Sequence, residues 1–180
     1  MSAETTEDRG DRPTIDDLAA RAADALRASG ASLAVAESLT GGMVVSHLAR
    51  REGASDWLRG GIVAYASSVK HDLLEVRDGP VVSRGAAHDL AVNVARLLDA
   101  TVGLSVTGVG GPDPQDGVEP GTVWIGVAVA GEPCEPTCHE FEGSPTEVCE
   151  ATTHTVLQRL LEALGGADDG QHEGGTQGRV

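Results

Sequence analysis

Three side chains that can carry out acyl transfer lie near two turns of this chain of 180 residues. Ser38 follows the apolar run 31–36, while Tyr65 and Lys70 stand five residues apart and are the only tyrosine and the only lysine present. Serine becomes a nucleophile when a base removes its proton, and lysine is such a base where burial keeps its amine uncharged. Tyrosine could relay the proton. We therefore assign Ser38, Lys70 and Tyr65 as a candidate catalytic set for hydrolysing an amide or ester without a metal.

The turn after Ser38 supplies the second requirement of that chemistry. Residues 37–42 join an apolar strand to a helical pattern, and a helix start collects unpaired backbone N–H groups. The N–H groups around Thr40, Gly41 and Gly42 are predicted to face the oxyanion. Glu37 is interpreted as a turn or cap acceptor rather than a catalytic acid. These four residues together are predicted to form part of the substrate-binding surface.

Each of these residues also has a purely structural interpretation. Serine is favoured as the N-cap of a helix, and lysine is usually a solvated helix residue. The argument for function is that a sequence otherwise without lysine keeps one beside its only tyrosine. The glycine-rich segment 107–112 is by itself a weak phosphate signal, because such strand exits are common in α/β folds.

The hydrophobic periodicity predicts helices alternating with strands, which is typical of a three-layer α/β/α sandwich with a mixed, largely parallel sheet. Ligands bind beyond the carboxyl ends of the strands in such sheets, where Ser38, Tyr65 and Thr107 all fall. Helices are expected from Thr14 to Ser29, from Met43 to Arg51, after Ser67-Ser68, from Ser83 to Leu98 and from Pro145 to Leu164; strands are expected at 31–36, 60–65, 101–106, 122–130 and 134–141. We expect one folded domain over residues 14–164, between disordered segments 1–13 and 165–180.

The charge of the chain restricts its partners. Asp and Glu number 28 against 13 Lys and Arg, so the formal net charge is −15. Such a field repels nucleic acid and anionic membranes, and an anionic small ligand would need its own local positive site. An acidic surface poor in lysine is typical of proteins that work in high salt. A codon bias favouring arginine would give a similar imbalance.

The cysteines point to a reducing compartment. Cys134, Cys138 and Cys149 make an odd number, and no apolar segment resembles a signal peptide or membrane span, which favours a cytoplasmic protein. Cys134, Cys138 and His139 match no common metal-ligand spacing, so we interpret the cysteines as small buried side chains and expect no metal or cofactor.

Several blocks of the sequence resemble the CinA C-terminal domain, or PncC, family. The blocks are residues 36–42, 60–65 with Lys70 after them, 82–83, 106–112 and 120–126. Members of this family are nicotinamide-nucleotide amidases, which hydrolyse nicotinamide mononucleotide to nicotinate mononucleotide and ammonia in pyridine-nucleotide salvage. The resemblance implies the same nucleophile, base and tyrosine as above, a substrate pocket lined by Thr107, Gly108 and Gly111, no metal, and a homodimer or larger homo-oligomer.

One departure from the family pattern concerns the phosphate. The family usually has Gly-Asp-Arg and a further arginine where the last helix begins, whereas residues 141–149 here contain no arginine. Losing a charged hydrogen bond to phosphate costs about 1.5–3 kcal/mol. Arg84 and Arg59 are the candidates to replace it. Two alternatives therefore stay open: a non-catalytic nucleotide-binding or regulatory domain, and an amidase acting on another small amide.

Overall fold

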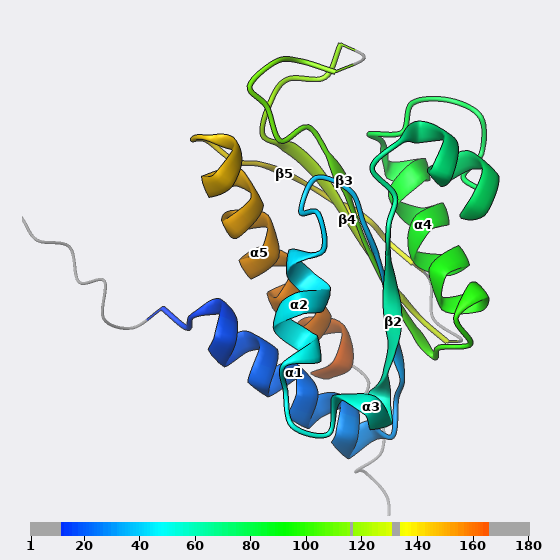
Figure 1. The fold of residues 1–180 in the computed structure, drawn as a ribbon, viewed down its shortest axis with the longest axis vertical. Coiled ribbons are helices and arrows are strands. Elements are labelled where there is room, and N and C mark those ends of the chain that lie inside the picture. Colours follow the sequence, from blue (N-terminus) through cyan, green and yellow to red (C-terminus); the bar gives the residue numbers. More distant parts are fainter. Residues whose placement is uncertain (1–11, 116, 131–133, 166–180) are drawn as a thin grey trace, which may run out of the picture.

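The computed structural model describes residues 12–115, 117–130 and 134–165, which form one five-stranded sheet with helices on both faces (Figure 1). In chain order the elements are α1 (Ile15–Ser29), β1 (Leu33–Glu37), α2 (Met43–Ala49), α3 (Ala54–Trp57), β2 (Leu58–Val63), the π-helix η1 (Val69–Leu73), α4 (Arg84–Leu97), β3 (Val102–Gly108), β4 (Thr122–Val129), β5 (Thr137–Glu140) and α5 (Pro145–Gly165).

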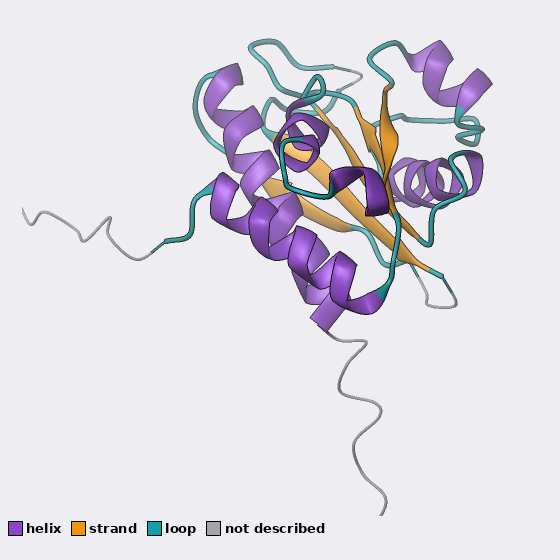
Figure 2. Cartoon of the chain, turned by 60° about the horizontal axis from the view of Figure 1, so that its bottom comes forward, coloured by secondary structure: helices purple, strands orange, loops and turns teal. Residues whose placement is uncertain are grey.

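The sheet has the strand order β2-β1-β3-β4-β5. β1 runs parallel to both β2 and β3, while β4 runs antiparallel to β3 and β5. Helices α1, α2 and α5 cover one face and α4 covers the other, as Figure 2 shows from a second direction. The predicted three-layer sandwich with a mixed sheet is confirmed.

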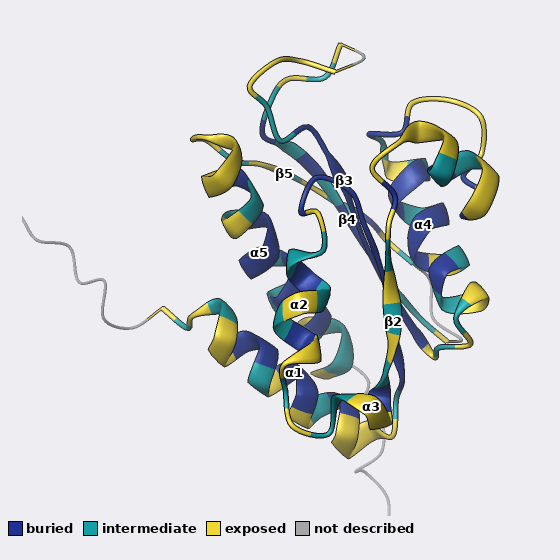
Figure 3. Ribbon diagram, in the orientation of Figure 1, coloured by how far each residue is buried: buried dark blue, intermediate teal, exposed yellow. Residues whose placement is uncertain are grey.

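Alternation along β1 divides its side chains between two cores. Leu33 and Val35 face the larger core, which α1, α2 and α5 close. Ala34 and Ala36 face the second core, together with Leu90 of α4. All five residues of β1 are buried, as expected for a strand covered on both faces (Figure 3).

Two helix starts follow the local sequence. The Thr14 hydroxyl accepts from the backbone N–H of Asp17, whose carboxylate in turn accepts from the backbone N–H of Thr14, and Gly30 ends α1 in the left-handed conformation at φ +66°. Ser83 caps α4 by accepting from the backbone N–H of Ala86 at 3.1 Å. Both predicted caps are confirmed.

The structure differs from several of the sequence-based expectations. Of the cysteines predicted as buried side chains, Cys138 is exposed and Cys134 and Cys149 are half-buried. The short helix α3 was not predicted, and β2 ends at Val63, so Tyr65 lies two residues beyond it. Ser68 precedes η1 but its side chain caps nothing, because its backbone is already helical. The predicted disordered segments 1–13 and 165–180 fall, apart from residues 12, 13 and 165, outside the described residues.

The loop before α4 is tied to that helix by an ion pair. Arg77 donates to the Asp89 carboxylate through Nε at 2.6 Å and Nη2 at 2.5 Å. This guanidinium lowers the pKa of Asp89 from 3.8 to about 2. A folded-state pKa below the unfolded value stabilises the fold above pH 4, and that stabilisation is lost as the pH falls towards 2.

Asp89→Asn is therefore expected to lower the free energy of unfolding at neutral pH by about 1 to 2 kcal/mol. This range is smaller than the pKa shift of Asp89 alone would give, because Arg77 is exposed and solvent screens the ion pair. The difference from the unsubstituted protein should shrink as the pH falls from 4 to 2. Urea denaturation at a series of pH values measures it. Asp24→Asn, which breaks an exposed pair with Arg27, is the control and should have little effect at any pH.

Candidate functional site

The carboxyl ends of the three parallel strands lie side by side at one edge of the sheet, the upper edge in Figure 1. Glu37 of β1 pairs with Val63 of β2, and the backbone N–H of Ala64 donates to the Glu37 carbonyl at 2.7 Å. On the other side, Ala36 pairs with Ser105 of β3. The residue after β1, Ser38, therefore lies between the exits of β2 and β3.

Three of the predicted site residues lie at this end of the sheet, and two of them are linked to the face that α4 covers. Ser38 follows directly on Glu37, the last residue of β1. The Thr107 hydroxyl donates to the Val81 carbonyl just before α4, at 2.6 Å. Lys70 belongs to η1, whose following residue Leu74 packs in the same core as α4.

Ser38 and Lys70 are both buried. Their exposed fractions are 6% and 2%, which is unusual for a lysine. Burial disfavours the charged form of an amine and also excludes water, the two conditions under which a lysine can serve as a base.

Tyr65 lies in a different environment from these two residues. It is 73% exposed, and two apolar side chains of the elements before and after it, Val63 of β2 and Leu73 of η1, are 46% and 48% exposed. The reason is its position, because β2 is the edge strand of the sheet and ends before Tyr65. The structure thus brings Ser38 and Lys70 into the protein interior but leaves the predicted third member at the surface.

Glu37 holds the turn together. Its buried carboxylate accepts four hydrogen bonds: from Thr40 Oγ1 at 2.7 Å and from the backbone N–H groups of Gly42, Val44 and Val45 at 3.0, 3.2 and 2.8 Å. A carboxylate placed there satisfies the unpaired donors of α2 and complements the positive end of its dipole. The predicted role of Glu37 as a cap acceptor agrees with this geometry.

This arrangement corrects the expected oxyanion donors. The N–H of Gly42 is bound to Glu37, and the N–H of Gly41 donates to the Ser38 carbonyl at 3.0 Å. The Thr40 hydroxyl also points to Glu37. The start of α2 is therefore occupied by the protein's own carboxylate, so these groups contribute to the site as the frame of the turn.

The second glycine-rich exit lies against the first. A Cβ on Gly110 would be 3.7 Å from Leu39, directly after Ser38. Gly108 packs on the backbone of β4, where a Cβ would meet the Thr122 carbonyl oxygen at 2.6 Å. Gly111 takes φ +88° before a cis peptide bond to Pro112. Glycine is thus required at position 108 for the close approach of β4, and at position 111 for a left-handed backbone.

Helix α5 also touches the Ser38 turn, which the sequence did not indicate. The Cys149 thiol donates to the Leu39 carbonyl at 3.1 Å, across 110 residues of sequence. Burial raises the pKa of this thiol, which favours the protonated form that can donate. The first turns of α5 thus lie beside the turn that carries Ser38, and the stretch 141–149 around the helix start contains no arginine.

The two arginines considered as replacements lie elsewhere. Arg59 is exposed on β2, and Arg84 lines a pocket that contains neither Ser38 nor Lys70. Within the described residues no group of three or more His, Cys, Asp or Glu side chains is arranged to hold a metal ion. No helix among them is both long and apolar enough to cross a membrane.

Comparison with known proteins gives consistent matches. A family model described as "CinA C-terminal domain" matches residues 15–164. A competence-damage inducible protein of Bacillus mycoides is 38% identical over 144 residues, and one of Bacillus cereus is 40% identical over 150 residues. These alignments cover 77% and 80% of this chain but 35% and 36% of the relatives, so the chain spans about a third of their length.

Solved structures agree with these matches. A competence or damage-inducible protein from Enterobacter asburiae superposes with a TM-score of 0.82 at 28% identity, covering 85% of this chain and 99% of that one. A CinA superfamily protein from Escherichia coli gives a TM-score of 0.81 at 28% identity, covering 87% and 94%.

Proposed function

Because the chain belongs to the CinA C-terminal domain family, we propose that it is an amidohydrolase that releases ammonia from the carboxamide of nicotinamide mononucleotide. The observation that supports this proposal is the burial of Ser38, directly after β1, and of the only lysine, Lys70, in η1, which follows the neighbouring strand β2.

In the proposed reaction the Ser38 hydroxyl attacks the carboxamide carbon while the neutral Lys70 amine takes its proton. The tetrahedral intermediate then collapses, the C–N bond breaks, and the Lys70 ammonium returns the proton to the leaving nitrogen, which departs as ammonia. Water attacks the resulting acyl-serine ester, with Lys70 again acting as base, to give the carboxylate and free Ser38. Since Gly41 and Gly42 have their N–H groups engaged, we assign the oxyanion to backbone N–H groups within residues 38–40.

In this proposal Tyr65 does not relay a proton, which was the role suggested by the sequence. At 73% exposure, its hydroxyl stands largely in water, which weakens any electrostatic contribution that it makes. We retain it as a residue at the entrance to the site, where it could contact a bound substrate.

A second candidate, a nucleotide-binding or regulatory domain without catalysis, is favoured by the start of α5. The Glu147 carboxylate accepts from the backbone N–H and the hydroxyl of Ser144 at 2.8 and 2.7 Å. An anion therefore already occupies the helix start where the family places arginines, which disfavours a phosphate there. An amidase acting on a small amide without phosphate would be compatible with the same feature.

Purified protein is expected to release ammonia from nicotinamide mononucleotide, measured by a coupled assay at high salt, where screening reduces repulsion of the anionic substrate. Nicotinamide riboside, which lacks the phosphate, and a panel of small amides are assayed in parallel. Release from another amide alone would replace the substrate but keep the chemistry. Binding of the nucleotide by calorimetry without ammonia release from any amide would favour the regulatory alternative.

A further inference from the structure

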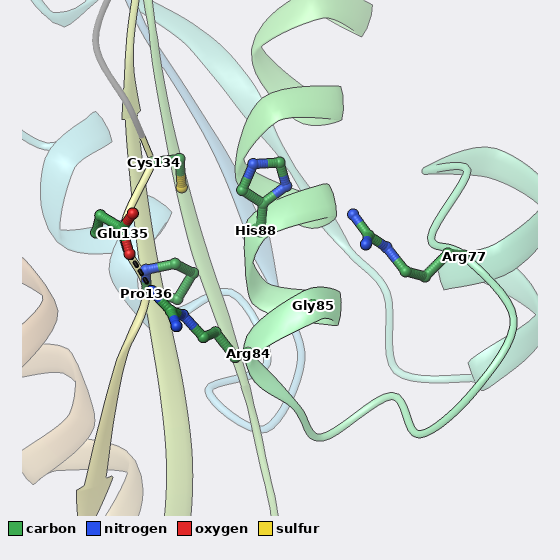
Figure 4. A pocket seen from close by; sticks show the side chains of 7 residues that line it. All are labelled: Arg77, Arg84, Gly85, His88, Cys134, Glu135 and Pro136. Carbon is green, nitrogen blue, oxygen red and sulfur yellow. Dashed lines mark hydrogen bonds and ion pairs between the residues drawn. The ribbon is translucent and has the colours of Figure 1, made fainter.

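A pocket of about 430 Å³ lies beside α4, against the segment that leads into β5 (Figure 4). Arg84 and His88 line it from α4, Arg77 from the preceding loop, and Cys134, Glu135 and Pro136 from the opposite side. We call it the α4 pocket. It includes none of the residues assigned above to the amidase reaction.

The basic side chains of the α4 pocket come from two segments. Arg84 and His88 are one helical turn apart and so share a face of α4, while Arg77 comes from the loop before that helix (Figure 4). In a chain with a net charge of −15, this cavity brings together two arginines, each paired with one carboxylate, and arginines are the groups that an anionic ligand needs.

The Asp89 carboxylate contacts two of these basic side chains, Arg77 and His88. It binds Arg77 through Nε and Nη2, which leaves Nη1 for another acceptor, and its oxygen lies 3.2 Å from Nδ1 of His88. Because Asp89 is ionised and only accepts, Nδ1 carries the proton that bridges to it.

Arg84 is held by a contact that is easily exchanged. Its Nη2 donates to the Glu135 carboxylate, but the two side chains are 63% and 69% exposed. An exposed pair of this kind contributes at most about 1 kcal/mol, so a competing oxyanion can replace Glu135 at little cost. Glu135 thus marks the position that an anionic group of a ligand would take.

We propose that the α4 pocket binds the phosphate group of a small anionic ligand, which displaces Glu135 from Arg84 and is held by Arg84 and Arg77. The planar guanidinium of arginine matches the oxygens of phosphate in a bidentate geometry, and Arg77 is already fixed in place. The remainder of the ligand would lie against Gly85 and Pro136.

Calorimetric titration of the whole protein at constant ionic strength, with inorganic phosphate and with ribose 5-phosphate as probes, tests this site. Arg84→Gln should weaken phosphate binding about tenfold, the effect of one charge-assisted contact. Arg96→Gln removes the same charge at another position of α4, where Arg96 forms an exposed pair with Glu75 of the preceding segment, and should leave binding unchanged. Equal weakening in both variants would show general charge effects only and overturn the proposal.

Glu135→Gln gives the opposite and more specific expectation. Removing the competing carboxylate should tighten phosphate binding, about three- to tenfold. Glu75→Gln is the matched control and should not tighten it.

Tighter binding of ribose 5-phosphate than of inorganic phosphate identifies a phosphate ester as the ligand class, and equal binding identifies free phosphate. If neither probe binds the unsubstituted protein or Glu135→Gln at about 10 mM, the proposal is wrong.

Discussion

Ser38→Ala is expected to reduce ammonia release from nicotinamide mononucleotide by about 10³-fold or more, because the variant lacks the atom that forms the acyl intermediate. The coupled ammonia assay measures the loss, and the thermal unfolding midpoint checks that the fold is kept. Ser46→Ala, which changes an exposed serine of α2, is the matched control and should retain full activity. Full activity of Ser38→Ala would falsify the proposed mechanism.

Lys70 supplies the second arm of the same experiment. Lys70→Met keeps much of the buried apolar volume but has no amine, so activity should fall as far as in Ser38→Ala. Lys70→Arg should be equally inactive, because a guanidinium stays protonated and cannot accept the proton of the serine. A variant with arginine that remained active would show that position 70 needs only a positive charge. Ser38 would then require a different base.

Glu37→Ala is expected to have the largest effect on stability, a loss of about 3 kcal/mol or more in the free energy of unfolding. The change leaves the buried N–H group of Val44 and the part-buried N–H groups of Gly42 and Val45 without an acceptor, and each such buried group costs about 1–3 kcal/mol. Urea denaturation measures it. Glu52→Ala, at an exposed position after α2, should change stability by less than about 0.5 kcal/mol.

Glu37→Gln separates the charge from the hydrogen bonds. The amide oxygen can still accept from part of the set, but its NH₂ group would face a backbone donor, so we expect an intermediate loss. If Glu37→Ala were as stable as the unsubstituted protein, the four hydrogen bonds would not be what holds the turn. Its activity should also fall, since the same turn carries Ser38.

The features that followed from sequence are those set by neighbours in the chain. Thr14 with Asp17, Gly30, and Ser83 with Ala86 act within about one helical turn, so their residue types suffice to predict them. The alternation of helix and strand also depends on local periodicity, which is why the sandwich was predicted correctly. In contrast α3 is a single turn that begins after a glycine without a side-chain cap, and nothing local distinguishes it from a loop.

The parts of the site that the sequence could not give depend on contacts across the fold. The Glu37 carboxylate reaches as far as Val45, and its interpretation as a simple cap did not reveal that it takes the donors proposed for the oxyanion. The exposure of Tyr65 follows from the place of β2 at the edge of the sheet, which periodicity does not determine. Arg84 meets Glu135 across 51 residues, so the pocket beside α4 had no signal along the chain.

The enclosure of Lys70 has a practical consequence for probing the dynamics of this protein. With one lysine in the whole sequence, and that one 2% exposed, a reagent that acylates ε-amines has a single target that the folded chain conceals. Mass spectrometry of such labelling over time would record how often the segment around η1 opens to solvent, in the same way as the exchange of a protected amide hydrogen reports local unfolding.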